Sequence, residues 1–409
     1  MIDIKNPEDC CGCRACVQAC PKQCIAFEPD AAEGFGYPKV DLSLCIDCHL
    51  CERVCPMLDK SGSSEPLKVL AAANPDRSVR MDSSSGGFFS MLAEDVISRG
   101  GSVFGVAMDA GCRSASHIEV TDSDSLAFLR GSKYLQASTG STFADVRRRL
   151  IDGKPVLYSG TPCQIHGLRL FLGKKLSESP LLLLVDVVCH GTPSPEAWRA
   201  YLNWRAAGSP VYGVNFRDKT ESGWRSFGVS LRLTPYDLQP SGEARLAGPD
   251  GPLPHAGQPG VVSECHRSDL FMRSFLSNVN LRPSCYNCPS NAGRSGSDIT
   301  LADFWGLPQS EAGDDNSGIS QLLVRTRRGA EALASLHLAD VREYPYSRVL
   351  AANPCAVRSV ARPDRRAYFW KYYRTDFPRA VRASAPPVPL ILRLKIKAAA
   401  LLGKLGIRR

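Results

Sequence analysis

From residue 67 onward, apolar runs alternate with amphipathic stretches. The segment LKVLAAA (67–73) has the length and composition of a buried strand, and so does SVFGVAM (102–108). Between them, SSSGGFFSMLAEDVISRGG (83–101) predicts a helix that begins after a Ser/Gly turn and ends at a glycine pair. We therefore expect a β–α–β unit within an α/β domain.

Two further strand–helix units are predicted between residues 154 and 207. KPVLYSG (154–160) and LLLLVDVV (181–188) have the pattern of buried strands, and each precedes a Gly-Thr-Pro turn and a helical pattern. Consecutive units of this kind usually form parallel neighbours through right-handed crossovers. The carboxyl ends of both strands should therefore meet at one sheet edge, where open α/β folds bind ligands.

The first 60 residues carry closely spaced cysteines instead of this alternation. The chain has 409 residues and 17 cysteines, a density that indicates disulfides in short secreted proteins. This chain is long, and its start, MIDIKNPEDC, lacks a basic-then-apolar leader pattern. No run reaches the roughly 20 apolar residues of a membrane-spanning helix. We therefore expect a cytoplasmic protein whose reduced cysteines hold metal.

Two cysteine motifs repeat one spacing. CCGCRACVQACP (10–21) and CIDCHLCERVCP (45–56) both follow C-x2-C-x2-C-x3-C-P, which is typical of bacterial ferredoxins with two [4Fe-4S] clusters. The fourth cysteine of each motif binds the other cluster. The predicted ligands are Cys10, Cys13, Cys16 and Cys55 for one cluster, and Cys45, Cys48, Cys51 and Cys20 for the other. Zinc is the alternative, but it favours two ligand pairs separated by a longer loop. Cys11 and Cys24 lie outside this spacing.

Four further cysteines form a candidate third metal site. Cys163 and Cys189 each follow a predicted strand, and RPSCYNCP supplies Cys285 and Cys288. Four thiolates suit a third [4Fe-4S] cluster. Alternatively, the first two are small buried hydrophobic residues and the C-x2-C pair holds zinc with other ligands. His166 and His190 are rival ligands. Cys112, Cys265 and Cys355 receive no role.

Two other features allow a functional and a structural interpretation. The turn before the helix at 83–101 could bind a phosphate, because helix N-termini favour anions, or could be a plain helix cap. Asp303, beside Phe304 and Trp305 in SDITLADFWG, could hydrogen-bond a bound ligand or could end a strand beside core aromatics. The glycine-rich turns do not match the dinucleotide fingerprint, and no catalytic residue can be named.

Several motifs together resemble a known family. SSSGGFF, SGTPCQIHGLR, VCHGTP, LRPSCYNCP and SDITLADFWG occur in the order seen in the coenzyme F420 hydrogenase/dehydrogenase beta-subunit family. The resemblance covers roughly residues 67–306 and implies an FAD domain with its own iron–sulfur cluster. It implies Cys163, Cys189, Cys285 and Cys288 as ligands of that cluster. The positions where it implies FAD contacts are Ser84, Ser85, Gly86, Gly87, Lys133 and Tyr134.

A flavin also suits the chemistry, because it converts between the single electrons of iron–sulfur clusters and two-electron organic substrates. The leading hypothesis is an iron–sulfur FAD oxidoreductase that passes electrons between the clusters and a deazaflavin-like or other two-electron substrate. Its expected partner is a redox protein or reduced ferredoxin. The alternatives are a non-catalytic electron-transfer subunit, and an iron–sulfur protein whose α/β domain binds no flavin and serves for docking.

The expected fold is a small ferredoxin-type α+β domain followed by an α/β flavin domain with a mixed sheet. The predicted division is 1–60, a linker at 61–66, an oxidoreductase domain at 67–360 and a basic helical tail at 361–409. The net charge is +9, and residues from Arg379 onward include basic but no acidic side chains. This tail could contact an anionic membrane surface, dock a partner or fray. The body lacks an extended basic–aromatic surface, which argues against nucleic-acid binding.

Overall fold

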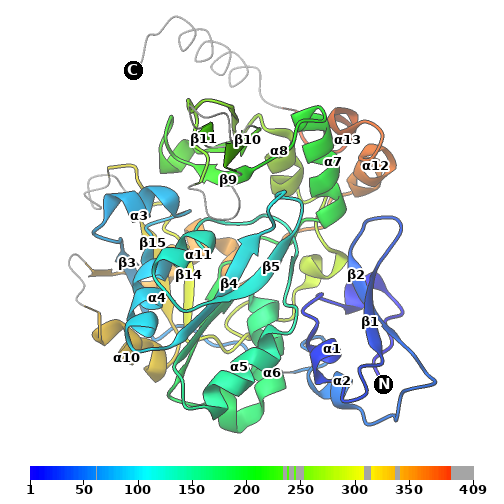
Figure 1. Ribbon diagram of the computed structural model, residues 1–409, viewed down its shortest axis with the longest axis vertical. Coiled ribbons are helices and arrows are strands. Elements are labelled where there is room, and N and C mark those ends of the chain that lie inside the picture. Colours follow the sequence, from blue (N-terminus) through cyan, green and yellow to red (C-terminus); the bar gives the residue numbers. More distant parts are fainter. Residues whose placement is uncertain are drawn as a thin grey trace, which may run out of the picture.

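The N-terminal part of the chain forms a small module (blue in Figure 1). The computed structural model describes residues 1–60, 62–233, 253–307, 315–336 and 341–387, and the backbone of the short strands β11 (Asp237–Leu238) and β12 (Ala244–Arg245). Within the module, β1 (Ile25–Pro29) and β2 (Gly36–Val40) pair as an antiparallel hairpin. The short helices α1 (Ala15–Ala19) and α2 (Leu50–Arg53) each lie inside one cysteine motif.

A large mixed sheet forms the centre of the molecule. Its described strands number nine, in the order β16-β3-β15-β14-β8-β7-β4-β5-β6. The adjacent strands β14, β8, β7 and β4 are parallel. β15 and β16 run antiparallel to their neighbours, and β5 is antiparallel to β4 but parallel to β6. The bounds are Lys68–Ala72 (β3), Ser102–Met108 (β4), Ala115–Val120 (β5), Ala137–Ser138 (β6), Val156–Gly160 (β7), Leu182–Val187 (β8), Ile299–Asp303 (β14), Ser320–Val324 (β15) and Arg342–Glu343 (β16). The expected α/β class with a mixed sheet is confirmed.

The first predicted strand–helix–strand unit is present, but its strands are far apart in the sheet. β3, the short helix α3 (Arg77–Asp82), α4 (Phe88–Ser98) and β4 follow one another in the chain, yet β15, β14, β8 and β7 lie between β3 and β4 in the sheet. By contrast, β7 and β8 are direct parallel neighbours, as the sequence predicts.

Helices cover both faces of the central strands because residues along each strand alternate between two cores. In β8, Leu183 and Val185 pack with α4 and α10 (Arg327–Ala334), whereas Leu182 and Leu184 pack with α5 (Thr142–Ile151) and α6 (Pro162–Ser177). This alternation is the period-two pattern of a strand with two buried faces. The cysteine-bearing ends of β7 and β8 therefore emerge at one rigid edge.

A second layer stands over that edge. The antiparallel sheet β13-β10-β9 is formed by Gly213–Asp218 (β9), Gly228–Arg232 (β10) and Val261–Cys265 (β13). It packs with α7 (Pro195–Ala206), α8 (Leu270–Leu276), α12 (Arg366–Tyr372) and α13 (Phe377–Ser384). Among the described residues, the other α-helices are α3 (Arg77–Asp82) and α11 (Tyr346–Ala352).

The C-terminal region falls into two parts. Phe369 of α12 and Phe377 of α13 are buried in the core although they lie in the predicted tail at 361–409. Residues 388–409, which belong to the tail for which membrane contact, partner docking and fraying are the alternatives, lie outside the described residues. Within the part of the chain that is described, none of the helices combines the length and apolarity that crossing a membrane requires.

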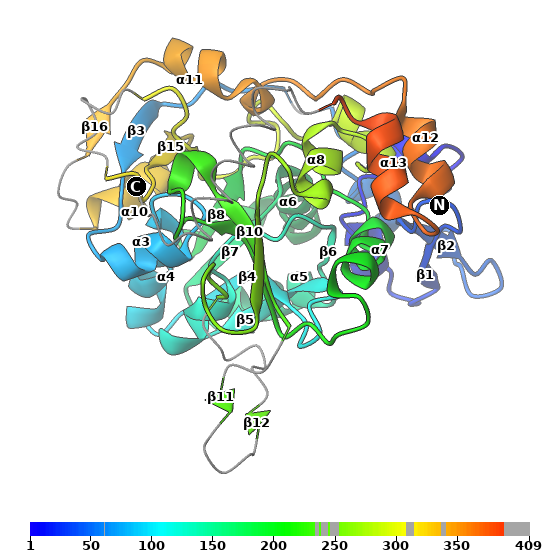
Figure 2. The same ribbon diagram turned by 90° about the horizontal axis from the view of Figure 1, so that it is seen from above.

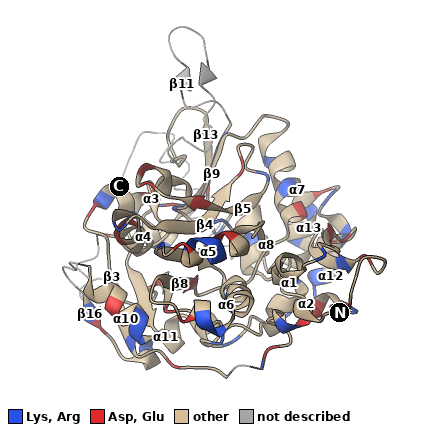
Figure 3. Cartoon of the chain, turned by 60° about the horizontal axis from the view of Figure 1, so that its bottom comes forward, with Lys and Arg blue, Asp and Glu red and all other residues tan. Residues whose placement is uncertain are grey.

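The module is joined to the rest of the chain by buried polar contacts. Figure 2 shows β1 and β2 beside α7, α12 and α13. The buried Arg366 pairs with Glu33 in the β1–β2 loop, and Tyr373 donates a hydrogen bond to the Ala32 carbonyl at 3.0 Å. Basic and acidic residues are interspersed on helices such as α5 and α10 in Figure 3.

Candidate functional site

The two cysteine motifs adopt the same local backbone. Arg14 and His49 occupy equivalent positions before the third cysteine, and both are left-handed, with φ of 62° and 58°. A one-turn helix follows each of them. Non-glycine residues rarely adopt this conformation, so its repetition at matching positions marks a structural repeat.

Their surroundings differ. Cys10, Cys13 and Cys16 of the first motif are buried, whereas Cys45 and Cys48 of the second are half-buried. The apolar side chains around Cys45 are largely exposed, at 65% for Leu42, 54% for Leu44 and 57% for Ile46. One motif therefore faces the body of the protein and the other faces solvent.

The cysteines approach one another across the motifs. Burial raises the pKa of Cys16 to about 12, and the charges of Cys10 and Cys55 add to the rise. Near the cysteines predicted for the second cluster, the sulfur of Cys20 lies 3.4 Å from that of the non-ligand Cys24. That contact raises the pKa of Cys24, and the charge of Cys45 adds to the rise. This arrangement is compatible with the crossed ligand assignment predicted from the spacing.

We name three cysteine sets by position. The inner set is Cys10, Cys13, Cys16 and Cys55; the outer set is Cys20, Cys45, Cys48 and Cys51; and the domain set is Cys163, Cys189, Cys285 and Cys288.

The domain set gathers at the carboxyl edge of the parallel strands. Cys163 lies at the start of α6, where Thr161 and Gln164 form a capping box, and Cys189 follows the end of β8. Cys285 lies in the turn at Pro283–Asn287, and Cys288 directly follows that turn. Burial raises the pKa of Cys189 well above its ordinary value, and the charges of Cys285, Cys163 and Cys288 raise it further. Cysteines far apart in sequence therefore lie close enough for their charges to act on Cys189.

The rival histidines have other partners. His166 contacts Asp59 at 2.8 Å and Ser290 at 3.0 Å, and His190 contacts Asn278 at 2.7 Å. Among the described residues, no three His, Cys, Asp or Glu side chains are arranged to hold a single metal ion. With both histidines bonded to other side chains, the candidate ligands at this edge are the four thiols of the domain set.

A cavity of about 740 Å³ opens beside the domain set. It lies at the ends of β7, β8 and β14, and both Cys163 and Cys189 line it. The predicted FAD contacts that line the same cavity are Ser84, Ser85, Gly87, Lys133 and Tyr134, and Asp303 joins them. Gly86 is not part of the lining but belongs to the same turn. The structure therefore brings the predicted flavin and cluster residues to one place.

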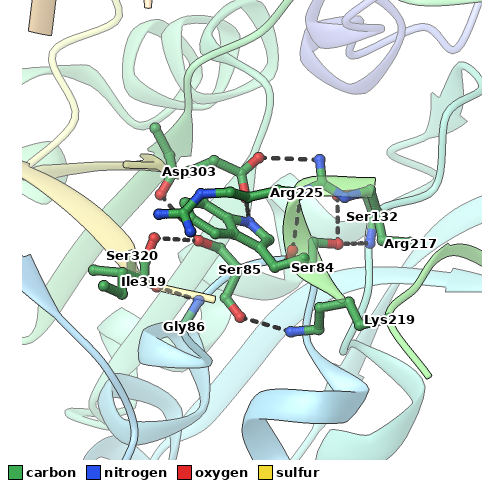
Figure 4. Close-up of polar contacts among 12 residues, drawn as sticks. Ser84, Ser85, Gly86, Ser132, Arg217, Lys219, Arg225, Asp303, Ile319 and Ser320 are labelled. Carbon is green, nitrogen blue, oxygen red and sulfur yellow. Dashed lines mark hydrogen bonds and ion pairs between the residues drawn. The ribbon is translucent and has the colours of Figure 1, made fainter. Parts of the chain in front are cut away.

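The Ser84–Gly87 turn is held from several sides (Figure 4). Ser85 donates to the Ile319 carbonyl at 2.7 Å, and the Gly86 N–H donates to Ser320 Oγ at 3.1 Å. A Cβ on Gly86 would lie 2.5 Å from the backbone nitrogen of Ser320, so only glycine fits there. Gly87 has φ of 75° and caps α4, which places the N-terminus of that helix at the cavity.

A buried Arg–Asp pair, which the sequence pattern did not reveal, stands opposite this turn. Arg217 of β9 donates to both oxygens of Asp303, at 2.9 and 3.0 Å, and to the Ser84 carbonyl at 3.1 Å. Its guanidinium lies 4.0 Å from the Phe227 ring centroid. Burial lowers the pKa of Arg217, but the charges and hydrogen bonds of Asp303 and Tyr134 outweigh burial, so the pKa of Arg217 is raised.

Asp303 is therefore occupied by protein groups. Besides Arg217, the Trp224 indole N–H donates to it at 2.6 Å, and the rings of Trp224 and Trp305 stack with centroids 4.6 Å apart. The carboxylate therefore positions both Arg217 and the Trp224 ring that stacks on Trp305. By contrast, Arg217 Nε is buried and has no hydrogen-bond partner among the described residues.

The lining is strongly basic. Its charged members are Arg130, Lys133, Arg217, Arg225 and Arg267, with Asp303 the sole acidic residue among the described lining residues. Lys133 donates to the carbonyls of Phe128 and Arg130, at 2.9 and 2.7 Å, and burial lowers its pKa to about 7. It supports the adjacent loop, while the cavity as a whole suits an anionic ligand.

Comparisons with known proteins agree with this organisation. A family model described as the C terminus of the coenzyme F420 hydrogenase/dehydrogenase beta subunit matches residues 153–344, which include the whole domain set. A 4Fe-4S dicluster domain matches residues 9–58, which include the inner and outer sets.

Two individual proteins are also similar. An uncharacterized protein in the rpl9-rpl11 intergenic region of Porphyra purpurea is 39% identical over 67 residues, covering 15% of this chain and 89% of its own. A chain in a structure of the F420-reducing [NiFe] hydrogenase complex from Methanosarcina barkeri aligns with a TM-score of 0.45 and 13% identity, covering 80% of this chain and 97% of that one. From the two family matches, residues 153–344 belong to the C-terminal domain family of the coenzyme F420 hydrogenase/dehydrogenase beta subunit and residues 9–58 form a 4Fe-4S dicluster domain, so the chain is an iron–sulfur electron-transfer protein related to that beta subunit.

Proposed function

We propose that this protein is an FAD-dependent iron–sulfur oxidoreductase that exchanges electrons between its clusters and a two-electron organic substrate. The observation that carries the proposal is the shared cavity, which places the Ser84–Gly87 turn and Arg217 beside Cys163 and Cys189. A deazaflavin is the first substrate to test, given the family.

The residues of the cavity fit a flavin dinucleotide. Its volume of about 740 Å³ lies within the range of about 300–1,000 Å³ for small-ligand sites. The turn at the N-terminus of α4 and the surrounding basic side chains suit a diphosphate, and Arg217 Nε is a buried donor in need of an acceptor. When bound, a flavin would supply the conversion between one-electron and two-electron transfer.

The domain set is proposed to hold a third [4Fe-4S] cluster. The Thr192 N–H donates to the Cys285 sulfur at 3.4 Å, and Arg282 acts electrostatically on both Cys163 and Cys285. Such donors and charges stabilise thiolates and thereby tune cluster potentials.

A redox protein is the proposed electron partner, and the outer set is its proposed docking point. Exposed Leu42, Leu44 and Ile46 lie around Cys45, so a partner bound there would come close to this set. Small apolar patches next to an otherwise polar surface are typical of transient protein contacts.

Cofactor analysis of anaerobically purified full-length protein tests the proposal. About twelve irons and about one FAD per chain are expected, with flavin absorption bleached by a low-potential reductant. About eight irons without flavin would contradict both the third cluster and the flavin. Cys163→Ser should lower the iron content, whereas Cys112→Ser, at a buried cysteine outside all three sets, should not.

Arg217 provides a sharper test of the flavin site. The variant R217M should lose bound FAD, but it also leaves the largely buried Asp303 carboxylate without its cationic partner. The double variant R217M/D303N removes both charges and should also lose FAD, whereas R327M, on the exposed face of α10, should retain it. Normal FAD content in the double variant would exclude Arg217 as a flavin contact.

A turnover assay distinguishes the proposed enzyme from the alternative hypothesis of a non-catalytic electron-transfer subunit. The holoprotein alone should oxidise a reduced viologen dye with a deazaflavin as acceptor. If it binds FAD and all clusters but reacts with none of the organic acceptors tested, the catalytic site lies on another chain.

A further inference from the structure

Arg282 is a fully buried cation that joins the first cysteine motif to the domain set. Its Nε donates to the Cys10 carbonyl at 2.6 Å, and its own carbonyl accepts a hydrogen bond from the Cys285 N–H at 2.9 Å. The two Nη groups donate to the Gln136 amide oxygen at 2.8 Å and to the Gly36 carbonyl at 2.9 Å. The side chain therefore reaches the inner set, while the backbone leads into the turn of the domain set.

The hydrogen-bond partners of Arg282 leave its charge unbalanced. All three acceptors are neutral, and among the described residues Arg282 has no carboxylate partner. The rings of Phe35 and Tyr37 lie beside the guanidinium, with centroids at 5.4 and 4.5 Å, and help to keep water away. Buried charges are ordinarily balanced by an opposite charge. The nearby groups that can supply negative charge are the cysteine sets on either side.

The first motif is shaped to admit this arginine. Gly12 has φ of 75°, and a Cβ there would lie 2.9 Å from Arg282 Nη1. The equivalent residue of the second motif is Asp47, which has φ of 51° and an exposed side chain. In that motif the arginine that donates to a cysteine carbonyl is Arg53, which is itself exposed. The repeated backbone thus forms without a buried cation, and only the first motif carries one.

We propose that Arg282 is the shared counter-charge of the clusters held by the inner and domain sets and raises the midpoint potential of both. A [4Fe-4S] cluster with four thiolate ligands carries net negative charge, and reduction adds one electron. A cation in a buried, water-poor environment therefore favours the reduced form. A guanidinium stays charged at every accessible pH, so the effect depends on no titration. For the domain set the inference rests on the proposed third cluster, whereas for the inner set it rests on the dicluster domain.

The test is an EPR-monitored redox titration of full-length protein loaded anaerobically, comparing Arg282→Gln, Arg282→Lys and Arg53→Gln with the wild type. The signal altered by Cys163→Ser identifies the domain cluster, and the signal altered by Cys45→Ser identifies the outer cluster. In Arg282→Gln, the ratio of reduced to oxidised inner cluster at a fixed potential should fall about tenfold. The domain cluster should shift in the same direction, and the outer cluster should not change.

The other two variants separate charge from structure. Lysine keeps the charge but loses the planar fork, so Arg282→Lys should keep most of the wild-type ratio at both clusters. A purely structural role would make lysine and glutamine shift the potentials equally. Arg53→Gln removes a charge next to Cys48, but water screens that exposed site, so the outer cluster should change little.

Unchanged inner potentials in Arg282→Gln at full iron content would overturn the inference, and so would equal shifts in both variants at position 282. If the glutamine variant fails to load iron, the lysine variant decides: it must load iron and keep the inner potential. The proposed third cluster can fail separately. About eight irons in the wild type would remove the domain half of the inference, while the inner potential would still test the charge of Arg282.

Discussion

The two cysteine motifs of the N-terminal module share a spacing and a backbone but not an environment. The first is buried against α6 and beside Arg282, which precedes the turn at Pro283–Asn287, and its carbonyls accept hydrogen bonds from Arg282, Thr139 and Gln136. The second is held mainly by its own neighbours, such as Arg53, which donates to the Cys48 carbonyl at 3.1 Å. Local sequence thus creates two equivalent cluster sites, and docking makes them inequivalent.

The largest contrast should come from removing the arginine that donates to the carbonyl of a cysteine in each motif, Arg282 for the first and Arg53 for the second. Arg282 is fully buried and donates to Cys10, Gln136 and Gly36, so Arg282→Ala leaves buried acceptors unpaired and should cost about 3–5 kcal/mol. Arg53→Ala, at an exposed site, should cost less than about 1 kcal/mol. Denaturant unfolding of the holoprotein measures both; equal losses would show that the first motif is not held by docking.

The hairpin loop offers a second pair of variants. Glu33→Gln weakens a buried ion pair with Arg366 and should cost about 2–3 kcal/mol. Glu28→Gln removes an exposed pair with Lys39 and should cost less than about 1 kcal/mol. Thermal unfolding followed by circular dichroism compares them, and a silent Glu33→Gln would contradict a docking role for this loop.

The contact between the end of the second motif and α6 should depend on pH. Burial lowers the pKa of His166, which lies against Asp59, so the folded state favours the neutral ring. This contribution to stability is complete above the ordinary value of about 6.5 and is lost as the pH falls towards the lower folded pKa. Unfolding free energies measured between pH 8 and pH 5 should fall less in His166→Asn than in the wild type. An identical pH dependence in both would refute this assignment, and the exposed His49→Asn serves as control.

Substitutions on the exposed side of the second motif should weaken partner binding and change the free energy of unfolding very little. Leu44→Asp and Ile46→Asp should alter stability by no more than about 0.5 kcal/mol but slow reduction by a ferredoxin. Reduction by dithionite should be unchanged, because this small reductant needs no docking surface. Ile151→Asp, at an exposed apolar residue of α5, should leave both rates unchanged. Equal slowing by all three variants would argue against a specific docking site.

The sequence predicted the cysteine motifs and the parallel β7–β8 neighbours because both depend on short-range spacing. It also placed Cys163 and Cys189 at one sheet edge, since each follows a strand of the same direction. The pairing of Asp303 with Arg217 was not predictable, because it joins β14 to a strand of a different sheet. The sequence did single out Asp303 as a candidate ligand contact. Because Arg217 and Trp224 donate to its oxygens, the structure gives Asp303 the role of positioning Arg217.

The sequence alone determined the repeated ferredoxin-type motifs, the mixed α/β domain and the order of its cysteine-bearing turns, because local spacing and periodicity encode these features. Only the tertiary structure decided which motif is inner, what Arg282 contacts and which charges line the cavity. Those properties depend on contacts between residues far apart in the chain, and such contacts leave no periodic pattern in the sequence.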